Sequence, residues 1–169
     1  MPIQREWFKD GPFVQVEFLR KSENGRMTLV LHESAVPVRA LWAIMDTPEL
    51  EAAREALGAR EGVHRSNFDR DIRAWSAGHD SAPRLIPDVA QWTQARGVDA
   101  VVWTALGPKF KGNDDVPTAD QVINYLRTLR GRTREEAERY IRQAPAQIDA
   151  RYRREIETAL NWTPVSVSP

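Results

Sequence analysis

The sequence contains no cysteine and only three histidines among its 169 residues. Without cysteine the chain has no disulfide framework, no thiolate nucleophile and no cysteine-ligated zinc site. The histidines, His32, His64 and His79, lie far apart, and none belongs to a spacing typical of metal ligands. The sequence also has no Walker-type phosphate loop and no G-x-S-x-G motif. We therefore expect no metal and no cofactor.

An excess of charge of one sign is missing too. The 24 basic residues balance the 24 acidic ones, which removes any global attraction to nucleic acid or to a membrane surface. No apolar run reaches the roughly 18 residues that a transmembrane helix needs, and residues 1–10 lack the apolar region of a signal peptide. These absences favour a soluble, cytoplasmic protein without membrane contact.

The sequence does contain enough apolar material for one core. Hydrophobic residues make up 41% of the chain and include six tryptophans, which argues against disorder. A length of 169 residues is typical of one domain. We predict a single domain over residues 1–162 and a flexible tail over residues 163–169.

The N-terminal third predicts a β-hairpin. Residues 13–19 alternate in polarity, which places every second side chain on a wholly apolar face and Glu17 on the opposite one. Asn24-Gly25 is typical of a type I′ turn, which requires positive φ at both central residues. Residues 27–31 supply the partner strand.

A third strand is predicted over residues 38–45, after which the apolar period becomes helical. Thr47 is a good N-cap and Pro48 a good first helical residue, and Gly62 ends this helix as a left-handed cap. The stretch that follows is polar and irregular, with three apolar residues as expected anchors: Phe68, Ile72 and Trp75.

The middle of the chain predicts one more helix and one more strand. The helix runs over residues 88–96 and ends at Gly97. The strand runs over residues 98–106, where a near-continuous apolar run indicates a central strand that is covered on both faces.

The C-terminal part predicts three helices. Thr118 with Gln121, and Thr133 with Glu136, form two capping-box patterns that mark the first two helix starts. The third helix covers residues 146–161. The fold class is therefore α+β, with a small mixed or antiparallel sheet and a C-terminal three-helix extension.

Residues 107–112, Gly-Pro-Lys-Phe-Lys-Gly, admit two interpretations. Two glycines and two lysines are compatible with binding of an anion. A phosphate loop, however, needs successive backbone N–H groups that lead into a helix, and Pro108 removes one of these donors. The alternative, which the sequence favours, is a solvated loop.

The C-terminal helices are rich in arginine, and two interpretations stay open. A basic helical face is typical of contact with phosphate backbones, but acidic residues interleave at spacings that allow i,i+4 pairs. Such interleaving is typical of a solvated face, so nucleic-acid binding is the weaker prediction. A protein partner or a homodimer contact could also use this face. The arginines are Arg127, Arg130, Arg132, Arg134, Arg139, Arg142, Arg151, Arg153 and Arg154.

The six tryptophans are spread evenly along the chain. Trp42 and Trp103 lie inside predicted strands, which indicates a core position for both. A stacking platform needs aromatic side chains that gather on one surface, and the sequence shows no such cluster.

Glu61 is the candidate catalytic residue. It is expected at the end of the helix that begins near Pro48, beside the negative pole of the helix dipole, where the ionised form of a carboxyl group is disfavoured. Such a carboxyl group suits general acid–base work near neutral pH. The alternative is a surface ion pair with Arg60 or Arg65.

One segment resembles a known enzyme family. Val38-Arg39-Ala40-Leu41-Trp42-Ala43 leads through the predicted helix to Leu57 and then to Arg60-Glu61-Gly62-Val63. This arrangement is similar to the core of gamma-glutamylcyclotransferase-like proteins, in which a tryptophan-bearing strand precedes a helix that ends in Glu-Gly. Residues 10–20, 24–31, 101–106 and 144–149 are similar to a bacterial branch of uncharacterised proteins near that family.

The resemblance implies a cofactor-independent cyclisation of a small γ-glutamyl substrate. The family's catalytic glutamate corresponds to Glu61, which would take a proton from the substrate's α-amine. The amine would then attack the γ-carbonyl carbon, and 5-oxoproline and the free amine would form.

The sequence departs from the family at the N-terminus. The family's Tyr-Gly-Ser-Leu loop, whose backbone holds the substrate, has no counterpart in residues 1–12. Three explanations stay open. An upstream segment is missing, the loop at residues 107–113 replaces it, or the chain keeps the fold without the reaction and acts as a binding or interaction protein.

Overall fold

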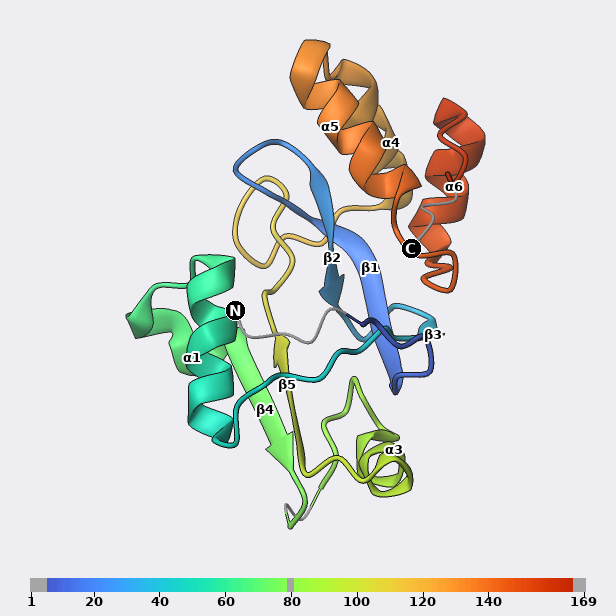
Figure 1. The fold of residues 1–169 in the computed structure, drawn as a ribbon. Helices are drawn as coiled ribbons and strands as arrows, with labels where there is room; N and C mark the ends of the chain where they lie inside the picture. Colours follow the sequence, from blue (N-terminus) through green and yellow to red (C-terminus); the bar gives the residue numbers. More distant parts are fainter. Residues whose placement is uncertain (1–5, 79–80, 166–169) are drawn as a thin grey trace. The chain divides into compact units, whose positions relative to one another are not determined.

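The computed structural model describes residues 6–78 and 81–165 and shows a mixed α+β protein (Figure 1). The chain forms two compact units, each built from two stretches of sequence. The first unit contains residues 1–14 and 39–106, and the second contains residues 15–38 and 107–169. A mixed fold with small antiparallel sheets agrees with the predicted fold class. None of the helices within the described ranges is long and apolar enough to cross a membrane.

A three-stranded sheet is built from β1 (Phe13–Lys21), β2 (Met27–Leu31) and β3 (Pro37–Arg39). The strand order is β2-β1-β3, and β1 pairs antiparallel with β2. The first two predicted strands are confirmed. The predicted third strand is wrong over most of its length, because β3 ends at Arg39 and Trp42 makes only an isolated bridge with Phe8.

The connection between β1 and β2 differs from the predicted type I′ turn. Lys21 pairs with Met27, and the Ser22 N–H donates to the Arg26 carbonyl over 2.8 Å. Gly25 has a φ of 77°, whereas Asn24 keeps a negative φ. The longer loop therefore needs only one left-handed residue, and glycine supplies it without a steric penalty.

Glu17 was expected on a polar face of β1, but its side chain is buried, with 3% exposure. Its Oε1 accepts the Phe18 N–H over 2.9 Å, and its Oε2 accepts the Tyr152 N–H over 3.0 Å. Tyr152 lies in the first turn of α6 (Arg151–Leu160), which has no side-chain cap of its own. Burial raises the pKa of Glu17 above its ordinary value, while the carboxylate satisfies an orphan donor at this helix start.

Three C-terminal helices are present as α4 (Ala119–Thr128), α5 (Gly131–Arg142) and α6, and the predicted start of the third at residue 146 is wrong, because α6 begins at Arg151. The capping box of Thr118 is confirmed. The second predicted box is wrong, because α5 begins at Gly131 with Arg130 as its N-cap. The helices and the sheet share one core, formed by Phe18, Met27, Phe110, Val122, Ile123, Leu126, Ala137, Ile141, Ala150, Ile156 and Trp162.

The segment after residue 106 is solvated only in part: residues 111–114 are exposed, as the sequence favours, whereas residues 107–110 are packed. Lys109 exchanges backbone hydrogen bonds with β1, accepting from Lys21 and donating to Leu19. Phe110 is buried in the core of the second unit. The Lys111 N–H donates to the Asp115 carboxylate. Because the amides of Lys109 and Lys111 already have acceptors, the loop offers fewer free donors for an anion than its glycines suggest.

The predicted tail falls only partly within the described residues. The Arg142 guanidinium donates to the Thr163 carbonyl, and the Val165 N–H donates to the Arg142 carbonyl. Residues 166–169 lie outside the described part of the chain. Flexibility of the tail and a single domain over residues 1–162 stay predictions.

The first unit contains α1 (Leu50–Glu61), a 3₁₀ turn (Arg65–Asn67), α2 (Phe68–Asp71), β4 (Ile72–Ser76), α3 (Val89–Arg96) and β5 (Ala100–Thr104). The predicted start of α1 is wrong, because its N-cap is Glu49 rather than Thr47 and the helix begins at Leu50, two residues after Pro48. Both predicted glycine ends are confirmed by positive φ at Gly62 and Gly97.

β4 and β5 form a two-stranded antiparallel sheet. β5 was predicted as a central, doubly covered strand, and this is wrong, because it pairs with β4 alone among the described strands and its residues stay half-buried. β4 was not predicted, since its five residues show no clean alternation. Two of the three expected anchors, Ile72 and Trp75, are nevertheless buried within it.

Gly58 fixes the distance between α1 and α2. A Cβ atom at this position would overlap the Phe68 ring, although Gly58 lies inside a helix where alanine is normally preferred. The Phe68 ring also lies beneath the Arg54 guanidinium, at 5.2 Å from its centroid. Glycine is therefore required here by close packing rather than by backbone conformation.

We predict that Gly58→Ala destabilises the protein by about 1–3 kcal/mol, because the added methyl group overpacks the contact with Phe68. In an open helix the same change would stabilise by up to about 1 kcal/mol. Urea unfolding measures the difference. Ala59→Ser, at the adjacent exposed position, is the control, and an unchanged or raised stability of Gly58→Ala would contradict the packing argument.

Candidate functional site

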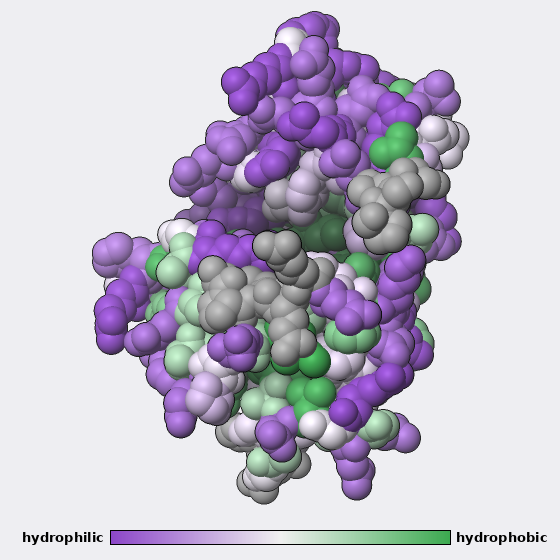
Figure 2. All heavy atoms as spheres, in the orientation of Figure 1, coloured by the Kyte–Doolittle hydropathy of each residue, from purple (hydrophilic) through white to green (hydrophobic). Residues whose placement is uncertain are grey.

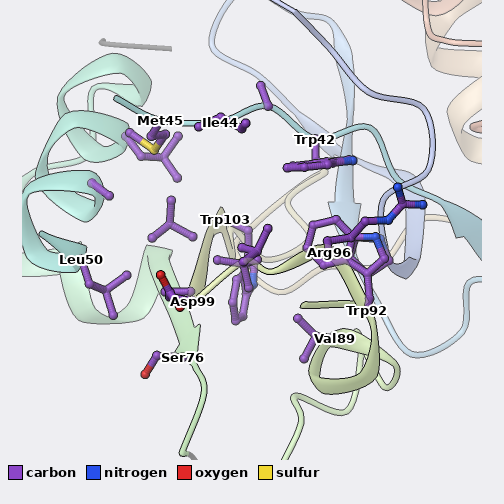
Figure 3. A pocket seen from close by; sticks show the side chains of 18 of the residues that line it. Trp42, Ile44, Met45, Leu50, Ser76, Val89, Trp92, Arg96, Asp99 and Trp103 are labelled. Atoms are coloured by element: carbon purple, nitrogen blue, oxygen red, sulfur yellow. The ribbon is translucent and has the colours of Figure 1, made fainter. Parts of the chain in front are cut away.

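The first unit contains a cavity of about 1020 Å³ (Figure 3). All of its lining residues belong to this unit. They come from α1, α3, the β4–β5 sheet and the connecting segment at residues 40–48. The volume lies at the upper end of the range of about 300–1,000 Å³ that is typical of small-molecule sites.

Regular spacing in the sequence builds two walls of the cavity. On each helix the lining residues recur every three or four positions, which places them on one face. The sets are Leu50, Ala53, Leu57 and Arg60 on α1, and Val89, Trp92 and Arg96 on α3. A third wall comes from β5, where the four consecutive residues from Ala100 to Trp103 line the cavity.

Aromatic rings form the fourth wall. Trp42 stacks on Phe8 with 4.7 Å between the ring centroids, and the backbones of the two residues exchange hydrogen bonds. Trp92 meets Trp42 edge to face, with 5.0 Å between the centroids. Trp103 lines the same cavity from β5. The structure therefore brings three tryptophans together, and Trp42 and Trp103, predicted as core residues, are both partly exposed.

Asp10 holds this wall in place. Its Oδ1 accepts the Trp42 indole N–H over 2.8 Å, and its backbone carbonyl accepts the Trp92 indole N–H over 2.7 Å. Its Oδ2 forms an ion pair with Arg96. The hydrogen bond from Trp42 and the nearby Arg96 guanidinium hold the pKa of Asp10 below its ordinary value. The two indoles thus have their N–H groups satisfied within the protein.

Glu61, the predicted catalytic residue, is the last residue of α1 and is not among the residues that line this cavity. The reason is helical geometry, because Arg60 continues the lining stripe of α1 and the next residue lies about 100° further round the helix. Glu61 Oε1 is 3.6 Å from Arg60 Nε, and both side chains are partly exposed. The surface ion pair with Arg60 is confirmed, and the catalytic role stays a prediction.

The histidines do not gather in the described part of the chain. The Nδ1 atoms of His32 and His64 each lie within 2.8 Å of the hydroxyl of the serine two residues on, Ser34 and Ser66. Within residues 6–78 and 81–165 no group of three or more metal-ligating side chains is suited to hold a metal ion. His79 lies outside the described residues.

Five of the nine arginines of the C-terminal segment form ion pairs with acidic residues in the described part of the chain, as their interleaving predicts. Figure 2 shows mostly hydrophilic side chains over the visible surface of α4 and α5. The ion pairs join Arg132 to Glu136, Arg142 to Glu138, Arg151 to Glu155, Arg153 to Glu157 and Arg154 to Asp149.

Arg153 was expected on the exposed basic face, but it is buried, with 3% exposure. Its guanidinium donates to the carbonyls of Ala144, Pro145 and Ile148. These carbonyls follow α5, so the side chain closes the connection between α5 and α6. Arg153 therefore has a structural role, and its side chain is not accessible to a partner that binds the exposed face of these helices.

Comparison of the chain with protein-family models, with curated proteins and with solved structures gave no match. The cavity therefore has to be interpreted from its own residues. One feature of the sequence points to this cavity: on α1 and on α3, the lining residues recur at helical spacing and so share one face of each helix. The sequence does not show that these two faces and three distant tryptophans surround the same cavity.

We predict that Arg153→Met destabilises the protein by about 3 kcal/mol or more, because three buried or partly buried carbonyls lose their donor and Glu157 loses its partner. Arg151→Met is the matched control, because Arg151 makes the same i,i+4 pair but its side chain is 68% exposed. We expect a much smaller effect there. Equal effects in denaturant unfolding would contradict the structural role of Arg153.

Proposed function

We propose that the first unit binds a small molecule with an apolar, ring-containing body in the cavity between α1, α3 and the β4–β5 sheet. The observation that carries this proposal is the convergence of Trp42, Trp92 and Trp103 on one space of about 1020 Å³. Mostly apolar walls with a few polar groups are typical of ligand sites.

The aromatic wall is held before any ligand arrives. Asp10 accepts hydrogen bonds from the indole N–H groups of Trp42 and Trp92. The Phe8 ring stacks on Trp42 and also holds it in place. Rings that are already fixed lose little conformational entropy on binding. This arrangement favours recognition by shape and ring contact.

Apolar side chains at the cavity are also left open to solvent. Trp7 is 50% exposed and Ile44 is 40% exposed, and both line the cavity. Exposed large apolar side chains next to a hollow are typical of interaction sites. A bound apolar body would remove this surface from water, at about 25 cal/mol per Å² of apolar area.

We predict that naphthylethanol, a neutral probe with a fused ring, binds the protein with a Kd in the range of about 0.1–1 mM. Trp103→Ala is expected to weaken binding about tenfold, because the loss of an aromatic anchor costs more than about 1 kcal/mol. Titration calorimetry measures both values. Thr104→Val, on the same strand but outside the lining, is the control, and equal affinities of the Trp103 variant and the wild type would contradict the site.

A γ-glutamyl cyclisation with Glu61 as general acid–base is a second candidate function. It is supported by the end of α1 at Glu61, followed by left-handed Gly62, which is the arrangement that the resemblance to gamma-glutamylcyclotransferase-like proteins implies. Arg60 lines the cavity and lies beside Glu61. A substrate carboxylate bound by Arg60 would therefore bring its α-amine near Glu61.

In this reaction Glu61 takes a proton from the α-ammonium group, and the freed amine attacks the γ-carbonyl carbon. The bond between that carbon and the leaving nitrogen then breaks. The leaving nitrogen takes up the proton that Glu61 holds and the further proton that the attacking nitrogen loses, and the products are 5-oxoproline and a free amine in its ammonium form. The developing oxyanion requires fixed N–H donors.

We expect wild-type protein to release 5-oxoproline from at least one member of a panel of γ-glutamyl dipeptides and amines. Glu61→Gln keeps the size and hydrogen bonding of the side chain but removes its basicity, and should abolish release. Chromatography of the products measures this. Glu55→Gln, an exposed change on the same helix, is the control, and unchanged turnover by Glu61→Gln would exclude the role.

A further inference from the structure

We infer that the ligand of this cavity is an organic cation, in which an apolar ring system carries an ammonium group that Asp99 and Glu49 receive. This inference rests on the proposed binding function of the first unit and names the chemical class of its ligand. The observation behind it is that the basic side chains of the cavity wall have acidic partners, whereas its acidic side chains have no basic partners among the described residues.

Among the described residues that line the cavity, four side chains carry a charge: Glu49, Arg60, Arg96 and Asp99. Both arginines have carboxylate partners that lie outside the lining. Arg96 pairs with Asp10, and Arg60 lies 3.6 Å from Glu61. The positive charges of the wall are therefore already compensated within the protein.

The two lining carboxylates differ from the arginines in this respect. Within residues 6–78 and 81–165, neither Glu49 nor Asp99 has a hydrogen-bond or ion-pair partner for its carboxylate. Glu49 is the N-cap residue of α1, yet its side chain makes no capping bond. Asp99 precedes β5 and uses only its backbone carbonyl, which accepts from Ala77. Two negative charges thus remain uncompensated on the wall.

The positions of these carboxylates match the shape of such a ligand. In the view of Figure 3, Asp99 and Leu50, the first residue of α1, are drawn on one side, and Trp42, Trp92 and Arg96 are drawn on the other. Glu49 directly precedes Leu50 in the chain. A ligand that spans the cavity would therefore place its rings against the indoles and its polar end beside the carboxylates.

The indole rings of the cavity also favour a positively charged ligand. The face of an aromatic ring is electron-rich and attracts a cation, and Trp103 lies in Figure 3 between Asp99 and the other two tryptophans. An ammonium group would meet both attractions, whereas a carboxylate of the same shape would be repelled by Glu49 and Asp99. Charge complementarity therefore selects a cationic occupant over a neutral or an anionic one.

The test compares three probes of one shape: naphthylethylammonium, naphthylethanol and naphthylpropionate. We expect the cation to bind wild-type protein at least about tenfold more tightly than the alcohol, and the anion to bind most weakly. The advantage of the cation should shrink as salt is raised, because exposed charge pairs are screened. Calorimetry at low and high salt measures all six affinities.

Asp99→Asn and Glu49→Gln together should remove the preference for the cation while leaving the affinity for naphthylethanol within about twofold. Glu55→Gln is the matched control, because Glu55 is an exposed carboxylate of α1 that does not line the cavity. Both lining carboxylates are solvent-exposed, so circular dichroism is expected to show a folded double variant. A cation preference that persists in a folded double variant would overturn the assignment to these residues.

The outcomes separate this inference from the binding function on which it rests. If naphthylethanol binds in a Trp103-dependent way but the anion equals or exceeds the cation, the cation inference fails and the binding function stands. If none of the three probes binds at millimolar concentration, both fail. A cation preference that depends on Asp99 and Glu49 supports both.

Discussion

The cavity of the first unit depends on the contacts of one residue, Asp10. Its carboxylate and its backbone carbonyl take up the indole N–H groups of Trp42 and Trp92, which lie 32 and 82 positions further along the chain. The same carboxylate pairs with Arg96. Without these bonds the two indoles would have unsatisfied donors. One short acidic side chain therefore satisfies both indole N–H groups of the wall and neutralises the nearest cation.

The second unit uses buried charge in a different way. Glu17 accepts a backbone N–H at the start of α6, and Arg153 donates to three carbonyls between α5 and α6. Helix ends leave such backbone groups without partners, and a buried unpaired group is costly. Both charged residues thus close the connections of a shared helical core. The basic face that the arginine count suggests is correspondingly smaller, since Arg153 and several other arginines are engaged within the fold.

The pairing of charges also gives the cavity its chemical character. Composition balances the charges of the whole chain, but binding depends on which of them remain uncompensated at one place. On the cavity wall the arginines have partners, whereas the carboxylates of Glu49 and Asp99 have none among the residues that the structure describes. A chain with no net charge can therefore present a locally anionic, aromatic site. Glu61, singled out by its place at a helix end, belongs to the exposed end of the same helix and is paired with Arg60.

The sequence by itself determined the features that depend on neighbouring residues. Gly62 and Gly97 end their helices because only a left-handed residue fits there, Thr118 begins α4 through its capping box, and alternation predicts β1 and β2. Tertiary structure alone decided the pairing of β4 with β5, the burial of Glu17 and Arg153, and the meeting of three distant tryptophans. These depend on contacts between residues far apart in the chain, which local period and turn chemistry do not encode.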